Sequence, residues 1–125
     1  MTTWTSNELH VIGTADELEI APLRPDGAPR PAVPVWVVRD GDSLYVRSFR
    51  GPNGSWYRSA RAQGSGHIHS GGIGKDVALL PEDDPAVNHR VDEAYRGKYG
   101  RYGDRYVGPL VGTGAHGTTL RLVPR

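Results

Sequence analysis

The most chemically informative stretch of this sequence joins a predicted strand to a glycine-rich loop and then to the start of a predicted helix. The strand covers residues 43–49, the loop 50–55, and the helix begins at Trp56. Backbone N–H groups in such a loop, and the positive end of a helix dipole, favour an anion. Arg47, Arg50 and Arg58 lie close by in sequence, and guanidinium groups bind phosphate oxygens well. The stretch predicts a phosphate site without a Walker motif; an ordinary loop with surface arginines is the alternative.

Histidines and tyrosines supply the other candidate chemistry. His67 and His69 share one face of a predicted strand, which is one way to hold a metal ion, but no carboxylate stands beside them in sequence. We therefore predict no metal ligand and retain His67 as a candidate catalytic or substrate contact; a solvated histidine pair is the alternative. A tyrosine-rich stretch follows at residues 95–106. It either packs against the rest of the protein or a partner subunit, or forms a lid in which Tyr102 or Tyr106 donates a proton.

Two glycine-rich motifs do not support nucleotide binding. Residues 112–117 spell G-x-G-x-x-G, but a dinucleotide site needs a helix directly after that motif, and here a strand is predicted. We expect a loop there. Residues 71–75 resemble a phosphate loop, but His69 and Asp76 occupy the positions at which a Walker motif needs glycine and serine or threonine.

Short elements must position these residues. A capping box from Thr5 to Glu8 predicts a first helix ending near Gly13, and Asp84-Pro85 begins the strongest predicted helix. Six strands are predicted, and the apolar character of both faces of the second suggests that it is central: 17–23, 32–38, 43–49, 67–70, 75–80 and 118–123. The pattern predicts an α+β single domain over residues 1–125, with an N-terminal helix in 1–16 and a barrel core in 17–125.

Composition narrows the classes of partner. The 125 residues are the size of one domain, and 15 Lys and Arg against 14 Asp and Glu give a net charge of +1, so we expect no nucleic acid partner. The chain has no cysteine, which excludes disulfides, thiolate nucleophiles and Cys-ligated zinc. We see no signal peptide, and the longest apolar run, residues 35–38, is too short to span a bilayer. We expect a cytoplasmic protein without a membrane partner.

Several segments resemble the FMN-binding split-barrel superfamily, the pyridoxamine-phosphate-oxidase-like flavoproteins. Residues 25–30 and 33–46 look like its opening strands. Residues 48–60 are similar to the Ser-x-Gly-Gly…Pro-x-Trp-Tyr segment of the deazaflavin (F-420)-dependent nitroreductase family, and residues 99–106 and 120–124 also fit. The chain looks closest to an uncharacterised branch of this group, a domain of unknown function.

This resemblance implies a six-stranded split β-barrel with short flanking helices, usually a homodimer. It implies FMN or coenzyme F-420 along residues 33–38, and hydride transfer to or from a small organic substrate. The cofactor supplies that chemistry, and the protein supplies orientation and electrostatics. The implied cofactor-binding residues are Arg24, Arg30, Pro34, Val35, Trp36, Arg47, Ser48, Arg50, Gly51, Ser55, Trp56 and Arg58.

Two other functions remain open, because one barrel can host many activities. The first is an enzyme of non-redox chemistry without a flavin, such as an isomerase or cyclase, or a metal-assisted enzyme that uses His67 and His69. The second is a non-catalytic module that binds a small ligand. A yellow cofactor bound to the purified protein would distinguish the redox function from these two alternatives.

Overall fold

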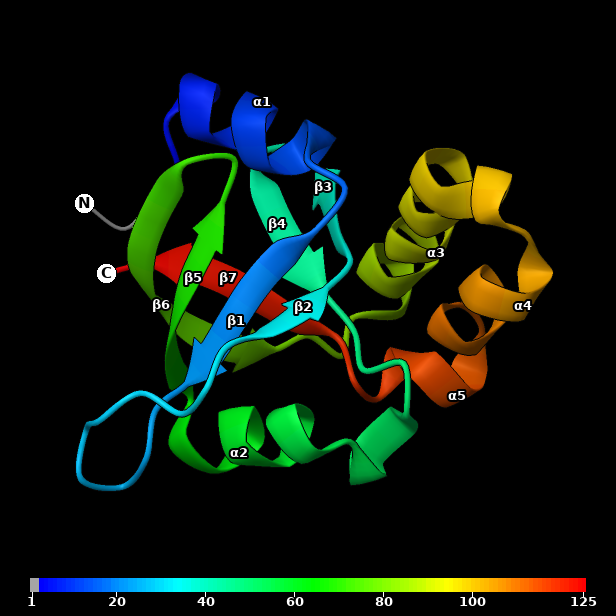
Figure 1. The fold of residues 1–125 in the computed structure, drawn as a ribbon. Helices are drawn as coiled ribbons and strands as arrows, with labels where there is room; N and C mark the ends of the chain where they lie inside the picture. The colour runs from blue at the N-terminus through cyan, green and yellow to red at the C-terminus, as the bar shows by residue number, and fades with distance from the viewer. Residues whose placement is uncertain (1–2) are drawn as a thin grey trace.

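Antiparallel strands wrap into a nearly closed barrel, with helices at its two ends and along one side (Figure 1). The computed structural model describes residues 3–125, in which seven strands form one sheet in the order β2-β1-β5-β6-β7-β4-β3. This confirms the predicted α+β split barrel. The strands are β1 (Leu18–Pro22), β2 (Val33–Val35), β3 (Val37–Asp40), β4 (Ser43–Val46), β5 (Ser65–Ser70), β6 (Ile73–Pro81) and β7 (Leu120–Pro124).

The second predicted strand, 32–38, is divided in the structure. It forms β2 and β3, separated at Trp36, so the sheet has seven strands where the sequence predicts six. The expectation of a central strand is wrong, because β2 pairs only with β1 and β3 only with β4. The two apolar faces have another cause: in β3, Val37 packs inside the barrel and Val38 packs outside it against α3. Trp36 therefore lies where the chain passes from one edge of the sheet to the other.

The helices begin largely where the sequence predicts. In α1 (Ser6–Thr14) the capping box forms between Thr5 and Glu8, and in α3 (Pro85–Tyr99) the Asp84 side chain accepts hydrogen bonds from the first turn. The G-x-G-x-x-G stretch contains a short helix instead of the expected loop, because Gly112 takes a positive φ and starts a new turn. The remaining helical segments are η1 (Gly51–Asn53), α2 (Ser55–Gln63), η2 (Gly100–Tyr102), α4 (Asp104–Val107), η3 (Gly108–Leu110) and α5 (Thr113–His116).

Two apolar clusters hold these elements together. One fills the barrel with residues such as Leu18, Ile68 and Leu122. The other lies between the outer face of β3–β4 and α3, and includes Tyr95 and Leu110. Each fully buried side chain of this size contributes about 1.5–3 kcal/mol, so the second cluster fixes α3 and the segment after it against one side of the barrel. Within residues 3–125, no helix combines the length and apolar character needed to cross a membrane.

Candidate functional site

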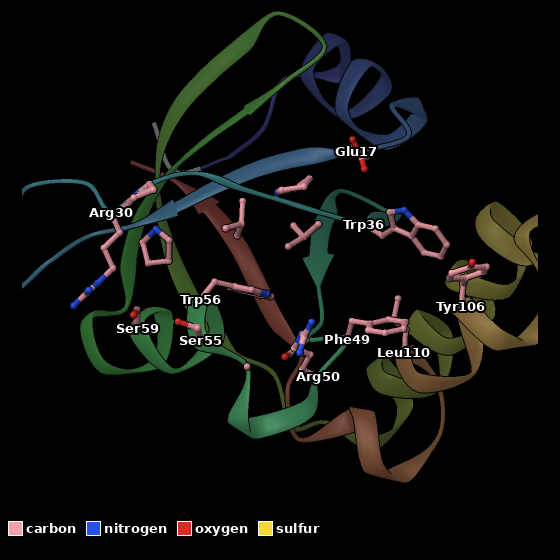
Figure 2. A pocket seen from close by; sticks show the side chains of 17 residues that line it. Glu17, Arg30, Trp36, Phe49, Arg50, Ser55, Trp56, Ser59, Tyr106 and Leu110 are labelled. Carbon is pink, nitrogen blue, oxygen red and sulfur yellow. The ribbon is translucent and has the colours of Figure 1, made fainter.

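A cavity of about 740 Å³ opens between β2, the residues that follow β4, α2 and the segment that carries α4 and η3 (Figure 2). Small-molecule sites in proteins have volumes of about 300–1,000 Å³. Its apolar lining comes from β2 and from four large side chains: Trp36, Phe49, Trp56 and Tyr106. The cavity has the size and the aromatic lining of a site for a planar organic ligand.

The cavity gathers nine of the residues that the sequence analysis singled out. They come from three segments that are distant in sequence, residues 30–36, 48–56 and 106, and the barrel brings these segments together. The nine are Arg30, Pro34, Val35, Trp36, Ser48, Arg50, Ser55, Trp56 and Tyr106.

The N-terminus of α2 lies at this cavity without a side-chain cap. Gly54 occupies the N-cap position, and no side chain in residues 3–125 caps the helix. A helix leaves its first N–H groups without partners inside the helix, and its dipole makes that end positive. With Ser55 and Trp56 of the first turn lining the cavity, this end of α2 is suited to an anionic oxygen.

Ser48 adds a hydroxyl at the same place. Ser48 is 1% exposed, and its Oγ has no hydrogen-bond partner in the part of the chain that the structure describes. A buried polar atom without a partner costs about 1–3 kcal/mol, so proteins rarely keep one without a reason. Gly54 provides the space beside it: a Cβ at Gly54 would lie 2.5 Å from Ser48 Oγ. The hydroxyl, the bare glycine and the helix end form a small cradle for an acceptor.

Two arginines complete the donors of the cavity. Arg50 follows closely after Ser48, and the Nε of Arg30 is a second buried atom without a partner among residues 3–125. In Figure 2, Arg30 and Arg50 lie in different parts of the cavity, with Trp56 labelled between them. This donor set fits a ligand that carries a phosphate group on an apolar, planar body.

Arg47 does not belong to this donor set, because it does not line the cavity; its contact with a cofactor stays a prediction. Its guanidinium is buried and makes five hydrogen bonds inside the protein, to Asp92, Thr119, Asn88 and the Leu110 carbonyl. The sequence analysis missed this because β4 ends at Val46, so the alternation of a strand no longer decides where Arg47 points.

The Arg47 network holds one wall of the cavity. Asp92 also binds His116 Nε2 at 2.8 Å and accepts a hydrogen bond from the Gly112 backbone. Because the carbonyl of Leu110 accepts from Arg47 and Leu110 lines the cavity, the network ties that wall to the end of β4. No local sequence signal marks Asp92, whose partners lie 20, 24 and 45 residues away.

Because Arg47 and Asp92 form a buried ion pair, we expect the protein to lose stability in acid. Burial raises the pKa of Asp92, but hydrogen bonds from Arg47 and His116 outweigh burial and hold the pKa below its ordinary value. The ionised carboxylate therefore stabilises the fold fully above its unfolded pKa of about 3.9, and this contribution is lost as the pH falls through the lower folded pKa. We expect urea unfolding of Asp92→Asn to show lower stability at neutral pH and a shallower decline below about pH 4. Asp83→Asn, at an exposed position, should keep the wild-type decline; equal declines in all three proteins would contradict the prediction.

The remaining predicted residues lie outside the cavity lining. Arg24 and Arg58 are exposed, and Gly51 lies in η1 with a positive φ. Tyr102 hydrogen-bonds Asp16 at the surface. These four residues are therefore not among those that line the cavity.

His67 belongs to a different part of the surface. It lies on the outer face of β5, its Nδ1 is 3.0 Å from Asp76, and both residues line a second hollow of about 480 Å³. Asp76 is opposite His67 on β6, a neighbour that sequence spacing did not reveal. Residues 3–125 contain no group of three histidine or acidic side chains arranged for a metal ion.

The chain is similar to known proteins in one family model and in several solved structures. The model described as "Uncharacterized protein conserved in bacteria (DUF2255)" matches residues 8–122. No curated protein matches the sequence.

The solved structures show the fold. A putative pyridoxamine 5'-phosphate oxidase from Listeria innocua is 15% identical, with a TM-score of 0.66 over 94% of this chain and 90% of that one. An F-420 reductase is 21% identical, with a TM-score of 0.52 over 98% and 94%. An FAD-binding protein from Mesorhizobium loti is 19% identical, with a TM-score of 0.59 over 98% and 91%. A heme storage protein from Vibrio cholerae, 12% identical with a TM-score of 0.60 over 93% and 86%, shares the barrel too. The split-barrel resemblance is thereby confirmed.

Proposed function

The chain belongs to the DUF2255 family, and from the cavity of this family member we propose that it binds a flavin-type cofactor, FMN or F-420, and transfers a hydride to or from a small organic substrate. The observation that carries the proposal is the Ser48 hydroxyl beside the start of α2, both of which lack a side-chain partner within the described residues 3–125. A cofactor phosphate would give both groups an acceptor. That solved neighbours are described as an F-420 reductase and an FAD-binding protein supports the choice of cofactor class.

The residues of this chain have distinct tasks in the proposed site. Ser48, the N–H groups at the start of α2 and Arg50 would bind the phosphate, and Arg30 would bind a further anionic oxygen of cofactor or substrate. The apolar side chains of β2 and the aromatic rings would hold the planar ring system and exclude water. The cofactor itself supplies the hydride chemistry when bound. Tyr106, which lines the cavity and is 49% exposed, is the phenol that we propose for proton donation.

Absorbance titration tests this function directly. The purified protein is titrated with FMN and separately with F-420, and riboflavin, which lacks the phosphate, serves as the control ligand. We expect a saturable spectral shift with one phosphorylated cofactor and weaker binding of riboflavin. If neither cofactor binds, the redox function is wrong, and a non-redox enzyme or a small-ligand module becomes the better explanation of the cavity.

Replacement of Arg50 probes the exposed side of the cradle. Because Arg50 is exposed, water screens its charge, and Arg50→Ala is expected to weaken the phosphorylated cofactor by about 1 kcal/mol, or about fivefold. Arg61→Ala is the matched control, since Arg61 is exposed on the last turn of the same helix and does not line the cavity. Riboflavin binding should not change in either variant. An equal effect of both substitutions would place the phosphate elsewhere.

A further inference from the structure

Trp36 and two tyrosines form an aromatic stack that leads from the cavity to the surface. The Trp36 ring is parallel to that of Tyr99, with ring centroids 4.0 Å apart and an angle of 3° between the planes. The Tyr102 ring lies 5.2 Å from Trp36 and 6.3 Å from Tyr99. Trp36 lines the cavity, and Tyr102 is 42% exposed. Three rings in contact thus connect the cavity wall with solvent.

Each ring of this stack can lose a single electron, Trp36 from its indole and the two tyrosines from their phenols. A phenol that does so becomes strongly acidic and is stabilised only when a nearby base accepts its proton. The proton acceptors of Tyr99 and Tyr102 therefore decide which of the two can form a stable tyrosyl radical.

Tyr99 has no such base among the residues that the structure describes. Its hydroxyl donates to the backbone carbonyls of Asp16, at 2.8 Å, and Val37, at 3.1 Å. Burial raises the pKa of this phenol, and a backbone carbonyl is too weak a base to take its proton after oxidation. A cation lies near each tyrosine ring, Lys98 at 4.9 Å from the Tyr99 centroid and Arg101 at 4.7 Å from the Tyr102 centroid, so the proton acceptor is what distinguishes the two. Tyr99 can therefore relay an electron, but its own oxidised form is not stabilised.

Tyr102 has a carboxylate partner. Its hydroxyl donates to Asp16 Oδ2 at 3.2 Å, and Arg101 donates to Asp16 Oδ1 at 2.7 Å, which keeps the carboxylate close to both residues. Arg101 also donates to the Tyr102 oxygen at 3.1 Å. The phenolic proton can therefore move to Asp16 when Tyr102 loses an electron.

We propose that Trp36, Tyr99 and Tyr102 form a route by which one-electron oxidising equivalents leave the cavity and end on Tyr102. A peroxyl radical that enters the cavity takes one electron from Trp36, becomes a hydroperoxide anion and leaves an indole radical cation. One electron then passes from Tyr102 to Trp36, directly or through Tyr99, and the Tyr102 proton moves to Asp16. The products are neutral Trp36, a neutral Tyr102 radical and a protonated Asp16, so charge is conserved. The electron-transfer route itself does not depend on the proposed function. Its use, to remove one-electron oxidants from a redox site, does rest on that function.

Pulse radiolysis in azide solution tests the route without any cofactor. The azide radical oxidises indole in preference to phenol and is itself reduced to azide. In the native protein we expect the absorption of the indole radical to decay as that of the phenoxyl radical grows with the same first-order rate at all protein concentrations. Tyr102→Phe should abolish the coupled growth and prolong the indole signal, and Asp16→Asn, which removes the base, should slow it.

Trp56→Phe is the matched control. Trp56 also lines the cavity, but its ring neighbour Tyr57, 6.1 Å away, donates to the backbone carbonyl of Gly117 and has no carboxylate partner there. This variant should keep the coupled growth, whereas Trp36→Phe should lose it. Coupled growth that persists in Tyr102→Phe, or that depends on Trp56, would overturn the proposal. Failure of FMN and F-420 to bind would overturn the proposed function and leave this result unaffected.

Discussion

Replacement of Arg47 by methionine is expected to lower the free energy of unfolding by about 3–5 kcal/mol, the cost of removing one partner from a buried ion pair. The Arg47 side chain is fully buried and Asp92 is 7% exposed, so the remaining carboxylate would stay in a dry environment without its charge partner. Domains of this size are stable by about 5–15 kcal/mol. Urea unfolding followed by circular dichroism measures the change.

Arg96→Ala is the control for the loss of an arginine on a structured element. Arg96 pairs with Glu93 on the surface of α3, with both side chains more than half exposed, so its removal should cost at most about 1 kcal/mol. If Arg47→Met were as mild as Arg96→Ala, the buried network would not hold the cavity wall. The double variant Arg47→Met with Asp92→Leu should recover part of the loss, because no unpaired charge remains.

Ser48→Ala is expected to separate stability from binding. Its hydroxyl has no protein partner among the described residues, so its removal should leave the free energy of unfolding unchanged or slightly higher. A hydrogen bond to a charged group contributes about 1.5–3 kcal/mol, so affinity for a phosphorylated cofactor should fall by about ten- to 150-fold. Isothermal titration calorimetry and thermal unfolding measure the two effects.

Two variants sharpen the interpretation of that result. Ser59→Ala is the control for binding, since Ser59 lines the same cavity farther along α2. Gly54→Ala should weaken the same cofactor because its Cβ would crowd the Ser48 hydroxyl. Loss of stability in Ser48→Ala with unchanged cofactor affinity would mean that the hydroxyl has a structural partner and that the phosphate lies elsewhere.

The expected homodimer stays a prediction, and sedimentation equilibrium of the purified protein would decide it. The aromatic residues Phe49 and Tyr106 are each about half exposed beside the cavity. Burial of such side chains in a second copy is the physical reason to expect association.

Local sequence determined the elements whose signals are local. The capping box at Thr5 and the Asp84 cap of α3 both formed as predicted, because each depends on residues only a few positions apart. The alternation of apolar residues identified the strands, and the strand, glycine-rich loop and helix start at residues 43–56 indicated one side of the cavity. The family resemblance of residues 48–60 pointed to the same side.

Tertiary structure alone decided which of these residues meet. The division of residues 32–38 at Trp36 depends on which edge of the barrel each half pairs with, and sequence periodicity carries no information about that. Arg47 and Ser48 are neighbours in sequence, yet Arg47 binds Asp92 on α3, whereas the Ser48 hydroxyl lies beside α2 with no partner among residues 3–125. The side chain of an arginine after the end of a strand goes where buried acceptors offset its desolvation. Here those acceptors come from α3, η3 and the residue just before β7, 41 to 72 residues away.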